Sequence, residues 1–179
     1  MTRKLKVGSF VSLDGVIENP TRIAGSYFDE EVKEYSFAAL ADVEFFLLGR
    51  VAYEMFASRP ETKGDKYADR LNGMKKLVAS RTLDEVAWNA SLINGDVAAE
   101  LAKIKQQSGG NIVKYGITNL DRTLLAAGLV DEYQIWVIPK VVGEGKRAFE
   151  DVDHEFVRLK LFDTHRFKNG VMVLSYVPQ

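Results

Sequence analysis

Apolar residues recur along the chain at the spacings that are typical of strands and of helices. Apolar runs of strand length predict strands at residues 4–13, 43–48, 76–79, 91–93, 111–115 and 132–138. Helical spacing of apolar residues predicts helices at residues 29–40, 50–57, 97–107 and 119–127. The run VEFFLL at 43–48 is almost continuously apolar, as expected of a strand that is buried on both faces.

The order of these elements predicts an α/β fold with a mixed sheet. Residues 111–138 read as strand, helix and strand, a unit whose two strands lie parallel. Near the C-terminal end, residues 156–167 and 171–177 predict two strands joined by Asn169-Gly170. Asn-Gly favours a tight hairpin because both residues tolerate positive φ. The sheet is therefore expected to have a parallel centre and an antiparallel C-terminal hairpin.

Length and composition favour a single globular domain that spans residues 1–179. The chain has 179 residues, of which 46% are hydrophobic and 27% charged, as in ordinary soluble proteins. None of the four prolines lies in a Pro/Gly/Ser-rich linker, so no domain boundary is expected. Because no secretory signal and no apolar run of membrane length is visible, we expect a cytoplasmic protein without a membrane partner.

Charge and residue types exclude several classes of chemistry. Lys and Arg total 24 and Asp and Glu total 25, and this net charge of -1 does not suit a protein that binds nucleic-acid phosphates. The absence of cysteine excludes disulfides, thiol nucleophiles and thiolate metal sites. His154 and His165 are too few for a histidine-rich metal centre, so no metal site is expected and both histidines are expected to be structural or exposed. Chemistry must then come from carboxylates, hydroxyls, backbone amides, arginines or a bound cofactor.

Two segments share the order strand, glycine, helix, which suits the binding of an anion. The first, LLGRVAY, has Gly49 at its turn, and the second, VKYGITNLD, has Gly116. Free amides at each helix start would point out from the carboxyl end of a strand, and glycine would let a phosphate approach. In the second segment, Thr118 and Asp121 have the spacing of a capping box. The alternative is that each glycine only makes a tight turn.

A third segment, Ser80-Arg81-Thr82, follows the strand predicted at residues 76–79. Two hydroxyls and a guanidinium at a strand end suit a phosphate monoester, and Arg50 supplies a second cation. An arginine pair near a dinucleotide favours NADP over NAD, because the 2′-phosphate needs a cation. The alternative is a surface arginine between two capping hydroxyls. The GxGxxG fingerprint of Rossmann folds is absent, so any dinucleotide site is of another type.

Asp14 is the first candidate for a carboxylate that acts on a substrate. It follows the first predicted strand, and the turn-rich residues 14–27 predict a long, flexible flap over a cleft. Asp14 could hold an NH or hydroxyl group of a substrate, or it could cap the turn before Gly15. The glycine-rich basic loop at residues 142–147 lacks the spacing of a P-loop, and it could bind a substrate phosphate or lie exposed to solvent.

Several segments, in chain order, carry a family resemblance: VSLDGVIEN, LLGRVAYEMF, YADRLNGMKKLVASRTL, YGITNL, LLAAGLVDEYQIWVIPKVVGEGKRAF and FKNGVMVLSYVP. Together they resemble the dihydrofolate reductase-like family. Within that family, the chain is most similar to the C-terminal reductase domain of the bifunctional riboflavin-biosynthesis protein and to its stand-alone bacterial homologues. The resemblance covers nearly the whole chain.

The resemblance implies a fold, a cofactor and a set of binding residues. The fold is a three-layer α/β/α arrangement with a mixed, mostly parallel sheet of about eight strands, about four helices and a C-terminal antiparallel hairpin. The cofactor is NADPH. The residues implied to bind it are Val11, Ile17, Gly49, Arg50, Val51, Ala52, Ser80, Arg81, Thr82, Gly116, Ile117, Thr118, Asn119 and Leu120. The residues implied to face the substrate are Ser12, Asp14 and Gly15.

The chemistry implied by the resemblance is hydride transfer from the nicotinamide to a carbon of a C=N or carbonyl group. The substrate would be a small heterocycle, either a pyrimidine similar to 5-amino-6-(5-phosphoribosylamino)uracil or a pterin. Asp14 is the first candidate for delivering the proton. The alternative is a nucleotide-binding protein of the same fold without turnover. Ile117 favours that alternative, because many relatives have a small residue there and a β-branched side chain would crowd the pyrophosphate.

The resemblance also bears on partners. Some relatives carry a fused zinc deaminase domain, whose metal site needs cysteines, so this chain is not expected to deaminate its substrate. Relatives often form dimers, which predicts a homodimer. Trp136 would then lie either at the association face or in the core.

Overall fold

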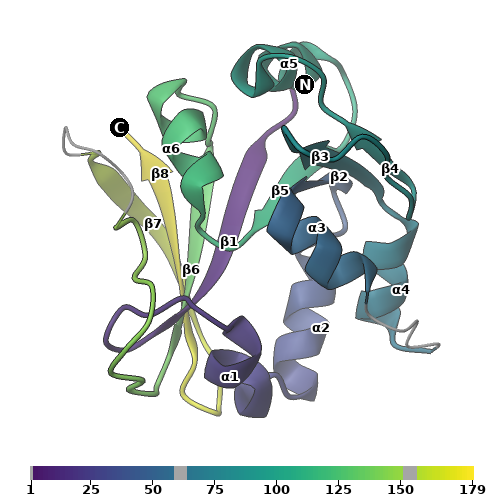
Figure 1. Ribbon diagram of the computed structural model, residues 1–179. Coiled ribbons are helices and arrows are strands. Elements are labelled where there is room, and N and C mark those ends of the chain that lie inside the picture. Colours follow the sequence, from purple (N-terminus) through teal and green to yellow (C-terminus); the bar gives the residue numbers. More distant parts are fainter. Residues whose placement is uncertain (1, 59–63, 151–156) are drawn as a thin grey trace. The chain divides into compact units, whose positions relative to one another are not determined.

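The computed structural model describes residues 2–58, 64–150 and 157–179, and its eight strands form one mixed sheet (Figure 1). The strands are β1 (Leu5–Ser12), β2 (Val43–Gly49), β3 (Lys75–Ala79), β4 (Ala90–Leu92), β5 (Asn111–Tyr115), β6 (Glu132–Ile138), β7 (Leu159–Arg166) and β8 (Met172–Pro178). Their order in the sheet is β4-β3-β2-β5-β1-β6-β8-β7. The predicted α/β class, the mixed sheet and the antiparallel C-terminal strands are thereby confirmed.

The helices are α1 (Pro20–Ala24), α2 (Glu30–Ala38), α3 (Arg50–Ala57), α4 (Lys66–Gly73), α5 (Val97–Gln106) and α6 (Asn119–Ala126), with a 3-10 helix η1 (Gly25–Tyr27). The described residues thus form six α-helices, more than the resemblance implied. In the described ranges, none of these helices is long and apolar enough to cross a membrane. By internal contacts the chain divides into a first unit, residues 1–5 and 34–114, and a second unit, residues 6–33 and 115–179.

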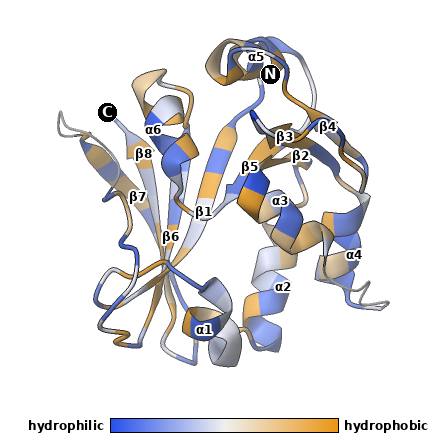
Figure 2. Ribbon diagram, viewed as in Figure 1, coloured by the Kyte–Doolittle hydropathy of each residue, from blue (hydrophilic) through white to orange (hydrophobic). Residues whose placement is uncertain are grey.

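The first unit is organised around the predicted buried strand β2. β3 and β5 pair with β2 in parallel, and β4 pairs in parallel with β3. Phe46, Leu47 and Leu48 are at most 1% exposed, which confirms that the VEFFLL strand is buried on both faces. Figure 2 colours the ribbon by hydropathy, with apolar and polar positions interspersed along the visible strands. The parallel register sets Gly49, the last residue of β2, opposite Ala79, the last residue of β3.

A buried arginine ties the N-terminal residues to the turn before β5. The Arg3 guanidinium lies 2.5 Å from a Glu44 carboxylate oxygen and donates to the carbonyl oxygens of Ser108 and Gly110. A Cβ added at Gly109 would collide with the Arg3 guanidinium. The Gly109-Gly110 pair is therefore required because neighbouring atoms occupy the space beside both residues.

The second unit joins parallel and antiparallel pairing. β1 pairs with β6 in parallel, and β8 pairs in antiparallel fashion with both β6 and β7. Trp136 on β6 is 7% exposed, stacks on Phe167 with ring centroids 5.7 Å apart, and meets the edge of Phe10 at 5.6 Å. Of the two places predicted for Trp136, the structure therefore shows the core.

The segment between β1 and α2 differs from the predicted irregular flap. Residues 20–27 form α1 and η1, and Asn19 caps α1 by accepting from the Arg22 amide at 3.1 Å. Helix α4 was not predicted either. Its eight residues carry few apolar side chains, and its start is fixed by Asp65, which accepts from the Tyr67 and Ala68 amides at 3.0 Å. Both helices are short and begin at a capping side chain, whereas a sustained apolar stripe is the signal that predicts a helix.

The hairpin between β7 and β8 also differs in detail from its prediction. The Phe167 amide donates to the Val171 carbonyl at 2.9 Å, and the Gly170 amide donates to the Phe167 carbonyl at 3.1 Å. Gly170 has φ of 90°, whereas Asn169 is not among the described residues with positive φ. The connection is thus a three-residue loop that ends in a left-handed glycine, rather than a two-residue turn. Asn169 instead donates to Asp29 at 2.9 Å.

The structure describes the surroundings of only one of the two histidines. His154 lies outside the described residues, as does Phe156, which was predicted to begin β7. His165 on β7 meets the ring of Phe167 edge-on, with centroids 4.5 Å apart, so it has a packing contact.

Replacing Gly110 with alanine tests the tight turn before β5. The new Cβ would lie 2.9 Å from the Glu44 Cβ and 3.0 Å from the Asp42 carbonyl oxygen, so the backbone must shift. We expect Gly110→Ala to lower the free energy of unfolding by about 1–3 kcal/mol, measured by urea denaturation. Gly73→Ala is the matched control, because a Cβ there meets nothing within 4 Å. Equal effects of the two substitutions would contradict the assigned role of the turn.

Candidate functional site

The first candidate turn lies in the first unit, between β2 and α3. Gly49 is the N-cap of α3 with extended backbone, φ −80° and ψ 167°, and no side chain caps the first amides of this helix in the described part of the chain. A Cβ at Gly49 would meet nothing within 4 Å, so the space beside the turn is open. The helix start carries Arg50, Val51 and Ala52, and Val51 is 72% exposed. An anion could approach these amides directly.

The Ser80-Arg81-Thr82 segment lies at the same edge of the first unit. β2 and β3 are parallel neighbours that end opposite one another at Gly49 and Ala79, so the residues that follow both strands share that edge. The Ser80 hydroxyl accepts from the Thr82 amide at 3.2 Å and from the Leu83 amide at 3.1 Å, which folds the segment into a tight turn. The predicted proximity of the Gly49 turn to the Ser80 segment is therefore present within this unit.

The guanidiniums at this edge remain accessible. Arg50 contacts Glu54 at 3.3 Å, but both side chains are about half exposed. An ion pair in that setting contributes little and can be exchanged for another anion. Arg81 is exposed. The edge therefore presents two cations and the amides at the start of α3.

The second unit holds the other predicted turn, at Gly116. Gly116 has φ of 77°, a left-handed conformation that favours glycine, and its amide donates to the Gly8 carbonyl at 2.8 Å. A Cβ at Gly116 would meet nothing within 4 Å. The predicted capping box is confirmed: the Thr118 amide donates to the Asp121 carboxylate at 2.6 Å, and the Leu120 amide donates to the Thr118 hydroxyl at 3.3 Å.

Ile117 lies on the interior side of this turn. Its side chain is only 4% exposed, whereas Asn119, two residues later, is exposed. The Ile117 side chain therefore packs in the protein interior and does not fill the open space beside Gly116.

The Asp14 carboxylate accepts hydrogen bonds from residues of two loops. Its carboxylate accepts from the Ser12 hydroxyl at 2.7 Å, from the Val142 amide at 3.1 Å and from the Gly143 amide at 2.7 Å. The bond from Ser12, followed by those from the two amides, holds the pKa of Asp14 well below its ordinary value. The carboxylate is thus ionised at neutral pH and joins the loop after β1 to the loop after β6.

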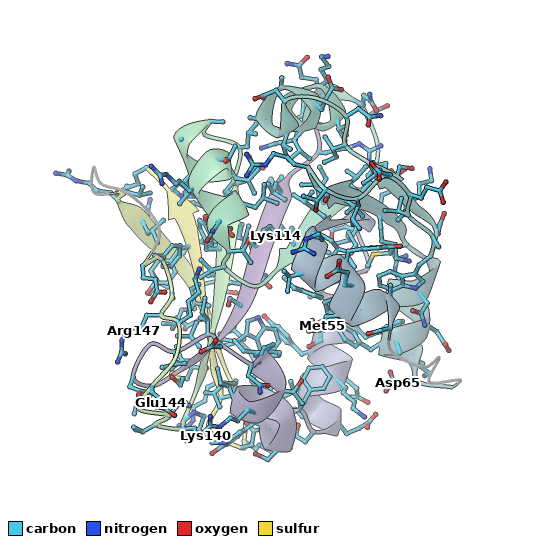
Figure 3. All side chains as sticks on the ribbon, in the orientation of Figure 1. Met55, Asp65, Lys114, Lys140, Glu144 and Arg147 are labelled. Atoms are coloured by element: carbon cyan, nitrogen blue, oxygen red, sulfur yellow. The ribbon has the colours of Figure 1, made fainter. Side chains whose placement is uncertain are left out.

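The glycine-rich loop after β6 extends this connection to α6. The Lys146 ammonium donates to the Asn119 side chain at 3.1 Å, and the Ile17 amide donates to the Lys146 carbonyl at 2.8 Å. Lys146 also donates through its own amide to the Glu18 carboxylate at 3.3 Å. Figure 3 labels Lys140, Glu144 and Arg147 along this loop. In the second unit, the structure therefore brings the Asp14 loop together with the start of α6.

The other residues predicted for this loop differ in their accessibility. Val11 is 7% exposed and Ser12 is 2% exposed, and the Ser12 hydroxyl also accepts from the Val16 amide at 2.9 Å. Gly15 has φ of 89° and so requires the freedom of glycine. Leu13 beside them is 66% exposed. Val11 and Ser12 are thus buried beneath the loop, whereas the turn from Leu13 to Gly15 is accessible to solvent.

One arrangement next to α3 had no signal in the sequence. Tyr53 of α3 accepts from the Ala87 amide at 2.8 Å and so fixes the turn that leads to Trp88, which has φ of 58°. The Lys76 ammonium lies 4.1 Å from the centre of the Trp88 ring and donates to the Asn72 carbonyl at 2.5 Å. Burial lowers the pKa of Lys76 to about 8. Through Tyr53, α3 is thus held against the turn before Trp88 in its own unit.

Comparison with known proteins identifies the family. Residues 3–173 match the family model of the RibD C-terminal domain, so the chain belongs to the RibD C-terminal domain family. The uncharacterised protein YyaP of Bacillus subtilis (strain 168) is 30% identical over 180 residues, covering 97% of this chain and 94% of YyaP.

Two solved structures share the fold. A protein named for riboflavin biosynthesis from Shewanella sp. PV-4 superposes with a TM-score of 0.77 at 18% identity, covering 100% of this chain and 99% of the other. Dihydrofolate reductase from Enterococcus faecalis, in complex with NADP(H) and RAB-propyl, superposes with a TM-score of 0.65 at 17% identity, covering 100% and 99%. The dihydrofolate reductase-like fold implied by the sequence resemblance is thereby confirmed.

Removing the Asp14 carboxylate tests its role as a tie between two loops. We expect Asp14→Ala to speed the hydrogen exchange of the Val142 and Gly143 amides by roughly fivefold or more, measured by NMR, because both amides lose their acceptor. Glu144→Ala, which removes an exposed carboxylate of the same loop, is the matched control and should leave both rates unchanged.

The same measurement has a defined pH dependence. A carboxyl group whose pKa is lowered in the folded state stabilises that state above its unfolded pKa of about 3.9, and this stabilisation is lost as the pH falls. Between about pH 5 and 8 the protection of Val142 and Gly143 should therefore be constant after correction for intrinsic exchange. A loss of protection within that range would show that Asp14 is not the ionised acceptor.

Proposed function

We propose that the protein is an NADPH-dependent reductase that transfers a hydride to a small heterocyclic substrate. Membership of the RibD C-terminal domain family supports a reductase. The observation that carries the cofactor assignment is the open edge of the first unit, where the start of α3 and the Ser80 segment follow neighbouring strands. Open space beside Gly49 and Gly116, where a Cβ would meet nothing, fits the approach of phosphates to the backbone.

In the first unit, this proposal gives the cofactor phosphates two sets of ligands. The amides and side chain at the start of α3, from Arg50 to Ala52, would hold phosphate oxygens next to Gly49. Ser80, Arg81 and Thr82 would hold the adenosine 2′-phosphate, because a guanidinium and two hydroxyls match a phosphate monoester. This set of ligands would favour NADPH over NADH, because only NADPH carries the 2′-phosphate.

In the second unit, the turn from Gly116 to Leu120 would hold the pyrophosphate. The capping box uses the Thr118 and Asp121 side chains to fix the start of α6, and the left-handed Gly116 leaves the backbone open to an anion. The burial of Ile117 supports this role, since its side chain is directed to the interior. Val11 near the end of β1, and Ile17 on the loop that Lys146 ties to α6, would support the nicotinamide end.

NADPH supplies the hydride when it is bound, and the residues of this chain would position the substrate and control its proton. Asp14 and Gly15 would face the substrate, and the buried Ser12 would hold the Asp14 carboxylate through its hydroxyl. Because Asp14 is ionised and held by three donors, it would act by orienting an NH group, a hydroxyl or a water molecule, and water would deliver the proton. A pyrimidine or a pterin offers both the C=N or carbonyl group to be reduced and the NH group that a carboxylate binds.

The hydrogen bonding of the Asp14 carboxylate also favours a second candidate, a nucleotide-binding protein of this fold without turnover. A carboxylate held with a low pKa has no proton to give at neutral pH. In that case NADPH would bind at the same residues and would not be oxidised. The two candidates differ in a single observable, the consumption of NADPH.

Substitution of Arg81 tests the proposed cofactor site. We expect Arg81→Gln to weaken NADPH binding by roughly tenfold to a hundredfold, as for the loss of a charge-assisted hydrogen bond, and to leave NADH binding unchanged. Cofactor fluorescence or calorimetry measures both dissociation constants. Arg158→Gln, at an exposed arginine of the second unit, serves as the control. Equal loss of NADPH and NADH affinity would place the 2′-phosphate elsewhere.

Turnover is tested separately by following NADPH absorbance with pyrimidines and pterins. We expect consumption of NADPH with one of these classes, and a kcat at least about tenfold lower for Asp14→Ala because the reacting group is no longer oriented. Tight NADPH binding with no consumption across both classes would overturn the reductase proposal in favour of the binding protein.

A further inference from the structure

The sequence contains three asparagine–glycine pairs, at residues 72–73, 94–95 and 169–170. Such a pair can lose ammonia without an enzyme, because the glycine backbone nitrogen can attack the carbonyl carbon of the asparagine side chain and glycine has no side chain to hinder the attack. The attack requires that no hydrogen bond holds the glycine amide and that the asparagine side chain can turn towards it. The structure holds two of the three pairs and leaves the third accessible.

The pair at residues 72–73 is held by a helix and by a neighbouring side chain. Gly73 is the last residue of α4, and helical geometry directs its amide to a carbonyl of the preceding turn. The side-chain oxygen of Asn72 accepts from the Trp88 indole NH at 3.0 Å. Both reacting groups are therefore engaged, and the attack would require the end of α4 to open.

The pair at residues 169–170 is held in the loop between β7 and β8. The Gly170 amide donates to the Phe167 carbonyl at 3.1 Å. The side-chain amide of Asn169 donates to the Tyr27 carbonyl at 2.9 Å, which fixes the direction of this side chain. The attack would therefore require both hydrogen bonds to break.

The pair at residues 94–95 has neither restraint. It lies between β4 and α5, and both residues are exposed. Within the described part of the chain, the Gly95 amide donates no hydrogen bond and the Asn94 side chain has no hydrogen-bond partner. The φ of 84° at Gly95 favours glycine, so the turn into α5 itself accounts for the residue that makes the pair reactive. We propose that Asn94 is a site of spontaneous deamidation in this protein.

The proposed reaction needs only water. The Gly95 nitrogen bonds to the carbonyl carbon of the Asn94 side chain and loses its proton, the bond from that carbon to the side-chain nitrogen breaks, and ammonia leaves. Water then opens the resulting cyclic imide. Attack of water at the side-chain carbonyl gives aspartate, and attack at the backbone carbonyl gives isoaspartate. In sum, an amide and water become a carboxylate and an ammonium ion, and nothing is oxidised or reduced.

The new carboxylate would lie at the edge of the first unit that carries the Ser80 segment. β3 and β4 pair in parallel, with Val78 opposite Leu92, and the Ile93 amide donates to the Val78 carbonyl at 2.9 Å. Asn94 therefore follows β4 at the edge where the Ser80 segment follows β3. The functional consequence rests on the proposed function: a carboxylate there would repel the 2′-phosphate, and so would weaken the binding of NADPH more than that of NADH.

Incubation of the full chain at mildly alkaline pH, in water enriched in heavy oxygen, tests the proposed site. Peptide mass spectrometry should find oxygen incorporation at Asn94 at least about tenfold faster than at Asn72 or Asn169, because those two pairs react only after local opening. In denaturing urea the three rates should converge, since all three are asparagine–glycine pairs. Equal rates in the folded protein, or faster conversion at Asn72 or Asn169, would overturn the proposal.

The variants Asn94→Asp and Asn94→Gln test the consequence for the cofactor. We expect Asn94→Asp to weaken NADPH binding by roughly threefold or more and to leave NADH binding unchanged, whereas Asn94→Gln, which adds no charge, should bind both as the wild type does. Equal NADPH affinity of Asn94→Asp and the wild type would overturn the link to the cofactor site. Conversion at Asn94 is measured without a cofactor, so a wild-type chain that binds no NADPH would overturn the proposed function alone.

Discussion

Strands that pair in parallel must be joined by a crossover, and in this protein the crossovers begin at turns that follow the carboxyl ends of buried strands. This constraint places the start of α3 and the Ser80 segment at one edge of the first unit, since β2 and β3 end in register at Gly49 and Ala79. In the second unit it leads to the left-handed Gly116 turn and the capping box of α6. The candidate phosphate ligands are thus the outcome of sheet topology, and glycine keeps the backbone at both turns accessible.

The second unit depends in addition on one ionised carboxylate. The Asp14 carboxylate accepts hydrogen bonds from one hydroxyl and two backbone amides, and so connects loops that are about 130 residues apart in the sequence. Closing a chain segment of that length costs conformational entropy. Lys146 continues the connection to Asn119 at the start of α6. Ordering of these loops before the substrate binds would reduce the entropy lost on binding, which is a general route to tighter and faster reactions.

Much of the fold could be predicted from the sequence, because buried strands such as VEFFLL and the βαβ unit at 111–138 carry strong periodic signals. The Gly49 and Gly116 turns could also be located, since a glycine that stands between an apolar strand and a helix marks a tight turn. Helices α1 and α4 could not, because their starts depend on side-chain caps from Asn19 and Asp65 and their apolar stripes are short. The partners of Asp14 could not be found either. Val142 and Gly143 donate through their backbone amides, and a backbone amide leaves no residue type to recognise.

The central claim is that this chain binds NADPH, with the 2′-phosphate at the open edge of the first unit, and an NMR titration of the backbone amides tests it most directly. With NADPH, the amides of residues 49–52 and 80–82 should shift and should saturate at the same cofactor concentration. The amides of α5, which carry none of the proposed ligands, should stay in place. Different saturation points for these two segments, or no shift of either at millimolar NADPH, would contradict the proposed cofactor site.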